Sequence, residues 1–119
     1  MSVLAAFLVM LVALLHVGFL VLEMFLWDKP AGLKVFRQSA ANAAVSKTLA
    51  ANQGLYNGFL AAGLIIGLAR GEAGVDLLVF SLCCVIAAGF YGAMTVSKRI
   101  LTVQAVPAIA ALLAVYLSL

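Results

Sequence analysis

Eight polar side chains interrupt the long apolar stretches of this sequence, and their types could support chemistry there. A carboxyl group in such a stretch could carry a proton or contact a ligand, and an imidazole could form a site or a structural hydrogen bond. Amide and phenol groups could hydrogen-bond a ligand or another helix. The candidate ligand-binding residues are His16, Glu23, Asn52, Gln53, Tyr56, Asn57, Tyr91 and Gln104.

Most of these residues are expected to lie at one depth in a membrane. At a helix rise of about 1.5 Å per residue, Glu23 lies about 6 Å inward from the boundary residue Trp27. The same rise places residues 52–57 at about 5–12 Å, Tyr91 at about 8 Å and Gln104 at about 6 Å. Because intramembrane polar groups face the bundle interior, we expect one polar layer in the cytoplasmic half of the membrane.

Structural interpretations of the same residues stay open. Glu23 could reach water or pair with Lys29 at the boundary, and an amide such as Gln104 could simply join helices. His16 and Glu23 share a helix face, but roughly 10 Å along the axis separates them. A ligand, a water chain or a residue of another helix would be needed to bridge them, with His16 at the deeper end of the layer.

The composition predicts the elements that position these residues. The chain has 119 residues, of which 67% are hydrophobic and 9% are charged, and this excludes a water-soluble domain. Four runs reach the roughly 20 residues that a membrane-spanning helix needs, at about 3–27, 49–69, 73–96 and 100–119. Backbone polar groups in lipid must be satisfied within each segment. We therefore expect a single all-α domain over 1–119, an integral membrane four-helix antiparallel bundle.

The basic residues predict the orientation of this bundle. The connection after the first run holds four of them, the connection after the third holds two, and the one after the second holds only Arg70. Positive residues stay on the cytoplasmic side, so both termini are expected outside. Membrane lipid, and no nucleic acid, is the partner that explains the net charge of +3. A bundle this small buries few of its helix faces, so we also expect a homo-oligomer.

The connections and helix faces carry further signals. Residues 28–32 have turn chemistry that ends the first helix. Residues 33–48 are rich in alanine, which favours a cytoplasmic helical extension of the second span, or alternatively a helix lying in the interface. Pro107 is expected to kink the last helix. Four glycines of the second span allow close helix approach, namely Gly54, Gly58, Gly63 and Gly67.

Residue counts exclude several other chemistries. One His and two Cys cannot build a zinc site from protein ligands alone. The adjacent Cys83 and Cys84 are expected to act as small apolar packing residues. The sequence has no Ser-His-Asp set, no dinucleotide-binding glycine motif and no phosphate-binding loop, and it identifies no cofactor.

Four parts of the chain share a pattern with a known family: Leu15-His16, residues 23–27, residues 52–60, and Gln104 with Pro107. On these residues the chain resembles a family of small bacterial membrane proteins catalogued as domain of unknown function 1304. The most specific part is the Asn-Gln-Gly-x-Tyr-Asn stretch, and the match runs over nearly the whole chain. The resemblance implies four transmembrane helices and brings no established activity. We expect the chain to lie in the bacterial inner membrane.

Two weaker similarities keep other functions open. In the MAPEG group (membrane-associated eicosanoid and glutathione enzymes), which also has four spans, the second helix resembles this chain at Asn52 and Tyr56, whereas Leu55 stands where those enzymes carry Glu. That similarity implies an enzyme acting on a lipophilic substrate. Small multidrug exporters have one membrane Glu in the first helix, and Glu23 could serve a proton-coupled transporter in the same way. We expect instead that the polar layer binds a lipid or an amphiphilic small molecule.

Overall fold

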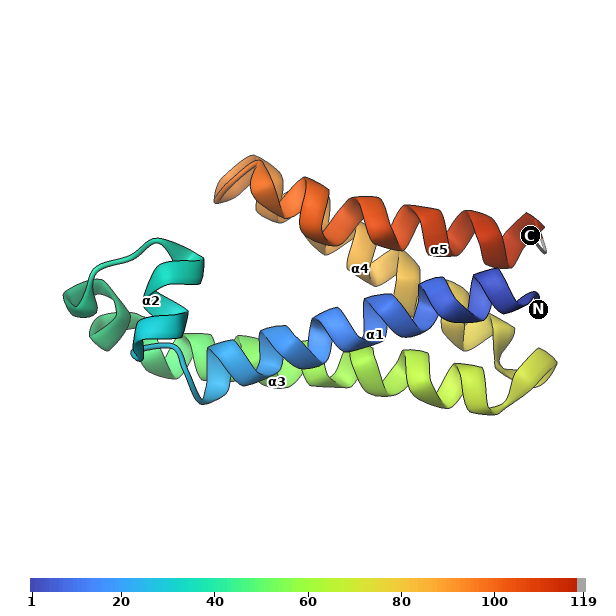
Figure 1. Ribbon diagram of the computed structural model, residues 1–119, viewed down its shortest axis with the longest axis horizontal. Coiled ribbons are helices and arrows are strands. Elements are labelled where there is room, and N and C mark those ends of the chain that lie inside the picture. Colours follow the sequence, from blue (N-terminus) through green and yellow to red (C-terminus); the bar gives the residue numbers. More distant parts are fainter. Residues whose placement is uncertain (118–119) are drawn as a thin grey trace. The chain divides into compact units, whose positions relative to one another are not determined.

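The computed structural model describes residues 1–117, and within that range the chain is helical and has no β-strand. The helices are α1 (Val3–Met24), α2 (Pro30–Phe36), α3 (Ala40–Ala69), α4 (Val75–Thr95) and α5 (Val106–Leu117), as Figure 1 shows. A 3-10 turn, η1 (Gly71–Gly74), precedes α4, and a π-helical turn, η2 (Leu101–Ala105), precedes α5. The all-α prediction is confirmed, while residues 118–119 of the predicted last span lie outside the described residues.

The helices divide between two compact units. Unit 1 consists of Met1–Leu14 and Leu60–Leu119, and unit 2 consists of Leu15–Phe59. Unit 1 therefore holds the first part of α1, the last part of α3, and α4, η2 and α5. Unit 2 holds the last part of α1, all of α2 and the first part of α3. Two of the predicted site residues, Tyr91 and Gln104, belong to unit 1, and the others belong to unit 2.

Unit 1 is held together by an aliphatic core and by close helix approach. Leu64 and Leu78 are among its largest fully buried side chains. Small residues bring α3 against α4: a Cβ placed on Gly63 would lie 2.7 Å from Ser81 Oγ. A Cβ on Gly67 would lie 2.5 Å from Leu78 Cδ2. The glycines therefore let the two helices pack more closely than larger residues would allow.

A π-helical turn stands directly before Pro107. The backbone N–H of Val106 donates to the carbonyl oxygen of Leu101, five residues earlier, instead of to the residue four positions back. In a regular α-helix the proline ring would clash with the carbonyl four residues before it, and a wider turn relieves that clash. η2 therefore stands directly before Pro107, and the kink expected at Pro107 stays a prediction.

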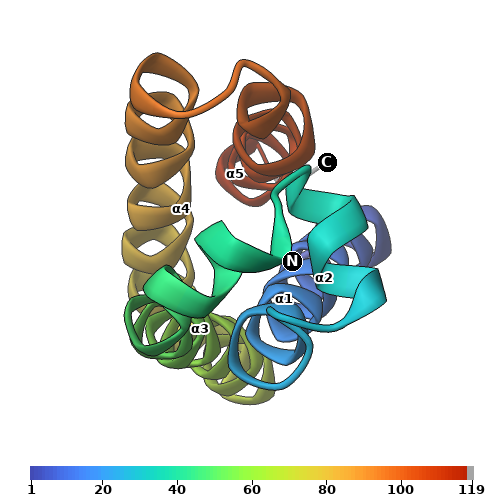
Figure 2. The same cartoon turned by 90° about the vertical axis from the view of Figure 1, so that its left-hand side faces the viewer.

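In unit 2, α1 ends before the apolar run does. The N–H groups of Phe25 and Leu26 both donate to the carbonyl oxygen of Val21, at 3.0 and 3.2 Å, and the chain then turns away. Pro30 opens α2 at a position where its missing N–H leaves no bond unmade. Figure 2 shows α2 as a helix separate from α3.

The helical extension expected over 33–48 is divided in the structure. Residues 33–36 belong to α2, whereas residues 40–48 form the first turns of α3. Arg37 has a left-handed backbone (φ 51°), and its N–H donates to the carbonyl of Lys34, which closes α2. Ser39 then caps α3, because its Oγ accepts a hydrogen bond from the N–H of Asn42 at 3.1 Å.

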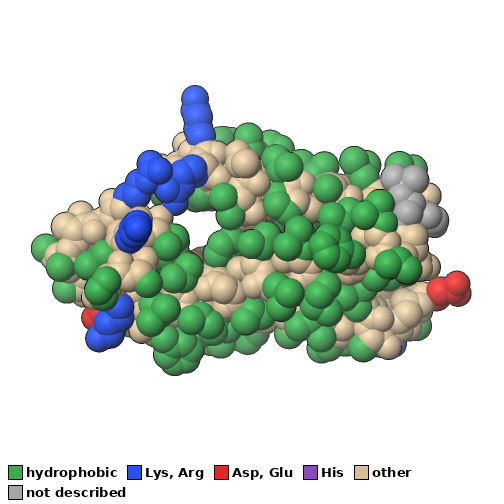
Figure 3. All heavy atoms as spheres, viewed as in Figure 1, with side chains coloured by type: hydrophobic (Ala, Val, Ile, Leu, Met, Phe, Trp, Pro, Cys, Tyr) green, Lys and Arg blue, Asp and Glu red, His purple; other side chains and the backbone are tan. Residues whose placement is uncertain are grey.

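Two helices of the described chain are long and apolar enough to cross a membrane. They are Val3–Met24 and Gly71–Thr95, and Leu101–Leu117 is a shorter apolar helix. The expected span at 49–69 does not reach the same apolarity, because polar residues at 52–57 interrupt it. Figure 3 shows hydrophobic side chains over most of the visible face.

Candidate functional site

Two of the predicted site residues meet directly in unit 2, where α1 packs on α3. The side-chain amide of Asn57 donates a hydrogen bond from Nδ2 to Oε1 of Glu23. Asn57 is only 8% exposed, so this hydrogen bond lies largely away from solvent. A buried acceptor without a donor is unfavourable, and the contact therefore holds the two helices together.

Two glycines make this contact possible. Gly54 and Gly58 are four residues apart on α3 and therefore share one helix face. A Cβ on Gly54 would lie 2.7 Å from Met24 Cγ and 3.0 Å from Glu23 Cβ. A Cβ on Gly58 would lie 2.6 Å from Leu20 Cδ1. The absence of both Cβ atoms lets the backbones come close enough for a short amide side chain to reach the carboxyl group.

An open groove of about 340 Å³ is lined by residues of the same two helices. Its lining comes from α1 and α3 and consists of Met24, Lys47, Thr48, Ala51, Asn52 and Leu55. One of these is a predicted site residue: Asn52, whose Nδ2 donates to the carbonyl oxygen of Thr48 at 2.9 Å. The lining changes from charged and polar groups at 47–48 to an apolar side chain at 55, about 11 Å further along α3.

The other candidates of unit 2 are not part of the groove lining. His16 is fully buried, and its ring packs edge-on against Phe19 with the centroids 5.1 Å apart. Tyr56 is 59% exposed and packs edge-on against Phe59, and Gln53 is exposed. The ring contacts of His16 and Tyr56 are therefore local, each made within a single helix.

Tyr91 and Gln104 lie in unit 1, where Gln104 makes a contact between elements. Its Nε2 donates to the backbone carbonyl of Val85 at 3.0 Å, which ties η2 to α4. Gly89 allows this approach, because a Cβ there would lie 3.0 Å from the Cβ of Ala105. Tyr91 is 69% exposed. The contact of Gln104 matches the structural interpretation of that residue, and the single polar layer stays a prediction.

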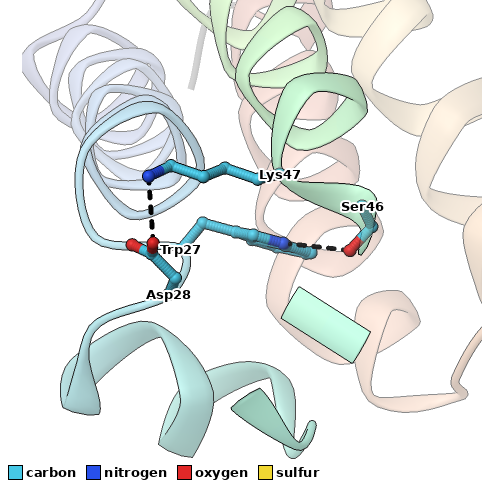
Figure 4. A network of polar contacts seen from close by, with 4 residues as sticks. All are labelled: Trp27, Asp28, Ser46 and Lys47. Atoms are coloured by element: carbon cyan, nitrogen blue, oxygen red, sulfur yellow. Dashed lines mark hydrogen bonds and ion pairs between the residues drawn. The ribbon is translucent and has the colours of Figure 1, made fainter. Parts of the chain in front are cut away.

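A polar network that residue types alone do not reveal joins the turn after α1 to the first part of α3 (Figure 4). Nε1 of Trp27 donates to Oγ of Ser46 at 3.1 Å. Nζ of Lys47 forms an ion pair with Oδ2 of Asp28 at 2.9 Å. The ring of Trp27 also packs on Phe36 of α2, with the centroids 4.7 Å apart. The sequence gives one indication of this network: Asp28 and Lys47 carry opposite charges and stand at the two ends of the segment that joins the first two apolar runs.

The ion pair should make this end of unit 2 sensitive to acid. The hydrogen bond from Lys47 lowers the pKa of the Asp28 carboxyl below its usual 3.8. A carboxyl with a lowered pKa stabilises the folded state above its unfolded pKa, and this stabilisation is lost as pH falls through the folded value. Fluorescence of Trp27, the only tryptophan, should therefore stay constant from about pH 8 to 5 and change slightly below about pH 4. Asp28→Asn should abolish this change in fluorescence. A change that persists in the variant would come from the titration of another group.

Comparison with known proteins shows a family resemblance without an assigned activity. Residues 10–116 match the profile of a family described as "Protein of unknown function (DUF1304)". The chain is 32% identical over 115 residues to "Uncharacterized protein YpaA" of Lactococcus lactis subsp. lactis (strain IL1403). The aligned region covers 95% of this chain and 97% of that protein. No solved structure matches. The function must therefore be argued from the geometry of the chain.

Proposed function

We propose that this chain, which belongs to the DUF1304 family, is an integral membrane protein that binds an amphiphilic molecule in the groove of unit 2. The observation that carries the proposal is the order of groups along that groove. Lys47 and Thr48 supply a cation and a hydroxyl at one end, Asn52 supplies an amide, and the lining beyond them is apolar. A molecule with an anionic or polar head and an apolar body matches this order.

Lys47 can bind a ligand although it is paired with Asp28. An ammonium group has three donors, and one hydrogen bond to the carboxylate leaves two. The Lys47 side chain is 57% exposed, and ion pairs between exposed groups contribute little to stability. An anionic head group could therefore join or replace the carboxylate with little loss of stability.

Large apolar side chains on the outside of both units support the membrane placement. Soluble proteins rarely expose large contiguous apolar patches, whereas lipid-facing surfaces consist of them. The exposed aromatic and aliphatic residues include Phe7 at 63%, Phe59 at 58%, Phe80 at 66% and Leu113 at 53%. The proposal includes four spans, both termini outside the cytoplasm, and assembly of several copies, as the distribution of basic residues and the small size of the bundle favour.

The groove favours binding over the two alternative functions. Leu55 lines it at the position where the MAPEG enzymes carry Glu, and the lining contains no acidic side chain. Glu23, the candidate proton carrier of a transporter, accepts a hydrogen bond from Asn57 and does not line the groove. Binding without turnover is therefore the function that these contacts support best.

A brominated fatty acid tests the proposal, because bromine quenches a nearby tryptophan and the chain has one, Trp27. Titration of the purified protein in detergent should give saturable quenching. Lys47→Met should raise the half-saturation concentration up to about fivefold, because a contact of an exposed charge contributes about 0.2–1 kcal/mol and about 1.4 kcal/mol is tenfold.

Two further variants separate ligand binding from loss of the ion pair. Asp28→Asn also removes the ion pair but leaves Lys47 in place, so its half-saturation concentration should be unchanged or lower. Lys98→Met, in unit 1, serves as the control for loss of one positive charge. Quenching that rises linearly in all variants would show simple partitioning into detergent and would contradict the proposal.

A further inference from the structure

The segment around α2 carries three cations that unit 2 does not fully neutralise. Lys29, Lys34 and Arg37 are all exposed. Unit 2 contains two acidic residues: Glu23, which contacts Asn57, and Asp28, which pairs with Lys47 and also interacts electrostatically with Lys29. Unit 2 therefore holds four basic residues against two acidic ones, and its positive charge is not fully compensated within the unit.

The packing of α2 turns these charges outward. Gly32 is buried against the backbone carbonyl of Leu26, and Phe36 packs on the ring of Trp27. Residues one helical turn apart share a face, so Ala31, Lys34 and Val35 form another side of this short helix. All three are exposed, and they combine a cation with an apolar side chain.

Arg37 stands where the backbone favours glycine. Its φ is 51°, and a left-handed backbone is strained for a residue with a Cβ. The turn itself requires backbone groups only: the N–H of Arg37 donates to the carbonyl of Lys34, and that of Gln38 to the carbonyl of Leu33. Glycine would close the same turn without strain. The turn therefore does not explain the guanidinium at this position.

We propose that Lys29, Lys34 and Arg37, with the outer face of α2, form a docking surface for anionic lipid head groups. The proposal rests on the membrane placement proposed above, but not on the groove. Its partner follows from position, because α2 comes directly after an apolar helix of membrane-spanning length and after Trp27, an aromatic residue typical of the interface. A cation near an anionic lipid surface gains about fivefold in binding, which is about 1 kcal/mol.

Quenching of Trp27 by brominated lipids measures this preference directly. The protein is placed in vesicles that contain the same mole fraction of brominated phosphatidylglycerol or of brominated phosphatidylcholine. The anionic lipid should quench more strongly, and about 1 M salt should reduce the difference because it screens exposed charges. Equal quenching by the two lipids would overturn the proposal.

The variants keep the fold while they remove single charges. Lys34→Gln and Arg37→Gly should each lower the preference for the anionic lipid about fivefold, and Arg37→Gly should leave α2 closed because glycine suits the turn. The control pair Lys98→Gln and Arg99→Gln lies in unit 1 and should leave the preference unchanged. A preference that persists in both α2 variants would overturn the docking surface.

The outcomes also separate this proposal from the proposed function. Lys47→Met should weaken fatty-acid binding without changing the lipid preference, because Lys47 lies in the groove and outside the docking surface. If saturable fatty-acid binding is absent but the lipid preference is retained, the result contradicts ligand binding in the groove and supports the docking surface. Absence of quenching by either lipid would contradict the membrane placement, and both proposals would then fail.

Discussion

Replacing Asn57 with leucine should destabilise the contact between α1 and α3 in unit 2 by about 1–3 kcal/mol. The substitution removes the amide that donates to Glu23 and leaves a carboxyl oxygen without that donor in a half-buried position. Leucine also introduces a larger apolar group beside Gly54 and Gly58, where the helices are closest. Equilibrium unfolding in mixed detergent micelles would measure the change.

A double-mutant cycle shows whether the hydrogen bond causes the loss. In Glu23→Leu/Asn57→Leu both polar partners are apolar, and such replacements are close to neutral when the shapes fit. The double variant should therefore be more stable than Asn57→Leu alone. Asn52→Leu is the control, because Asn52 is exposed and bonds a carbonyl of its own helix. Strictly additive effects of the two substitutions would contradict a direct coupling.

Gly32→Ala should have an effect at least as large, because it acts through rigid backbone atoms. A Cβ at this position would overlap the carbonyl oxygen of Leu26 and would lie 2.8 Å from that of Trp27. Backbone atoms cannot turn aside as side chains can, so α2 must move away from the end of α1. Overpacking of this kind destabilises by about 1–3 kcal/mol and occasionally by more. The emission of Trp27 should shift, since its contact with Phe36 is lost.

Gly18→Ala provides the matched control for this substitution. Gly18 lies within α1, and a Cβ there would meet no atom within 4 Å. Alanine is favoured over glycine inside a helix by about 0.5–1 kcal/mol, so this variant should be slightly stabilised. Wild-type stability and emission in Gly32→Ala would contradict close packing of α2 on the turn after α1.

The sequence predicts the helices of this chain better than their ends. Apolar runs locate α1, α4 and α5, because a long apolar segment has few other stable conformations in lipid. The run continues through Phe25, Leu26 and Trp27, however, and nothing in these residue types shows that α1 ends at Met24. The break between α2 and α3 is hidden for a related reason: glycine is the usual signal of a left-handed helix end, and the residue here is Arg37.

For the candidate site, the sequence predicts the depth of each polar residue but not the direction in which its side chain points. The rise of a helix predicts the level of each polar residue, and Glu23 and Asn57 do meet. Polarity does not predict where each side chain finds its partner. Asn52 bonds its own helix, and Gln104 bonds a main-chain carbonyl in α4. Every residue has a main-chain carbonyl, so residue types could not show that Gln104 bonds the carbonyl of Val85.

The extra residue in η2 has a consequence for the comparison of related chains. A π-helical turn holds one residue more than an α-helical turn, so the helix after it is rotated by about 100° relative to an uninterrupted helix. A homologue shorter by one residue between Leu101 and Ala105 could therefore keep every later side chain on the same face by winding this turn regularly. Alignments of the last helix should allow a one-residue gap there, since an ungapped match would pair outward positions with inward ones.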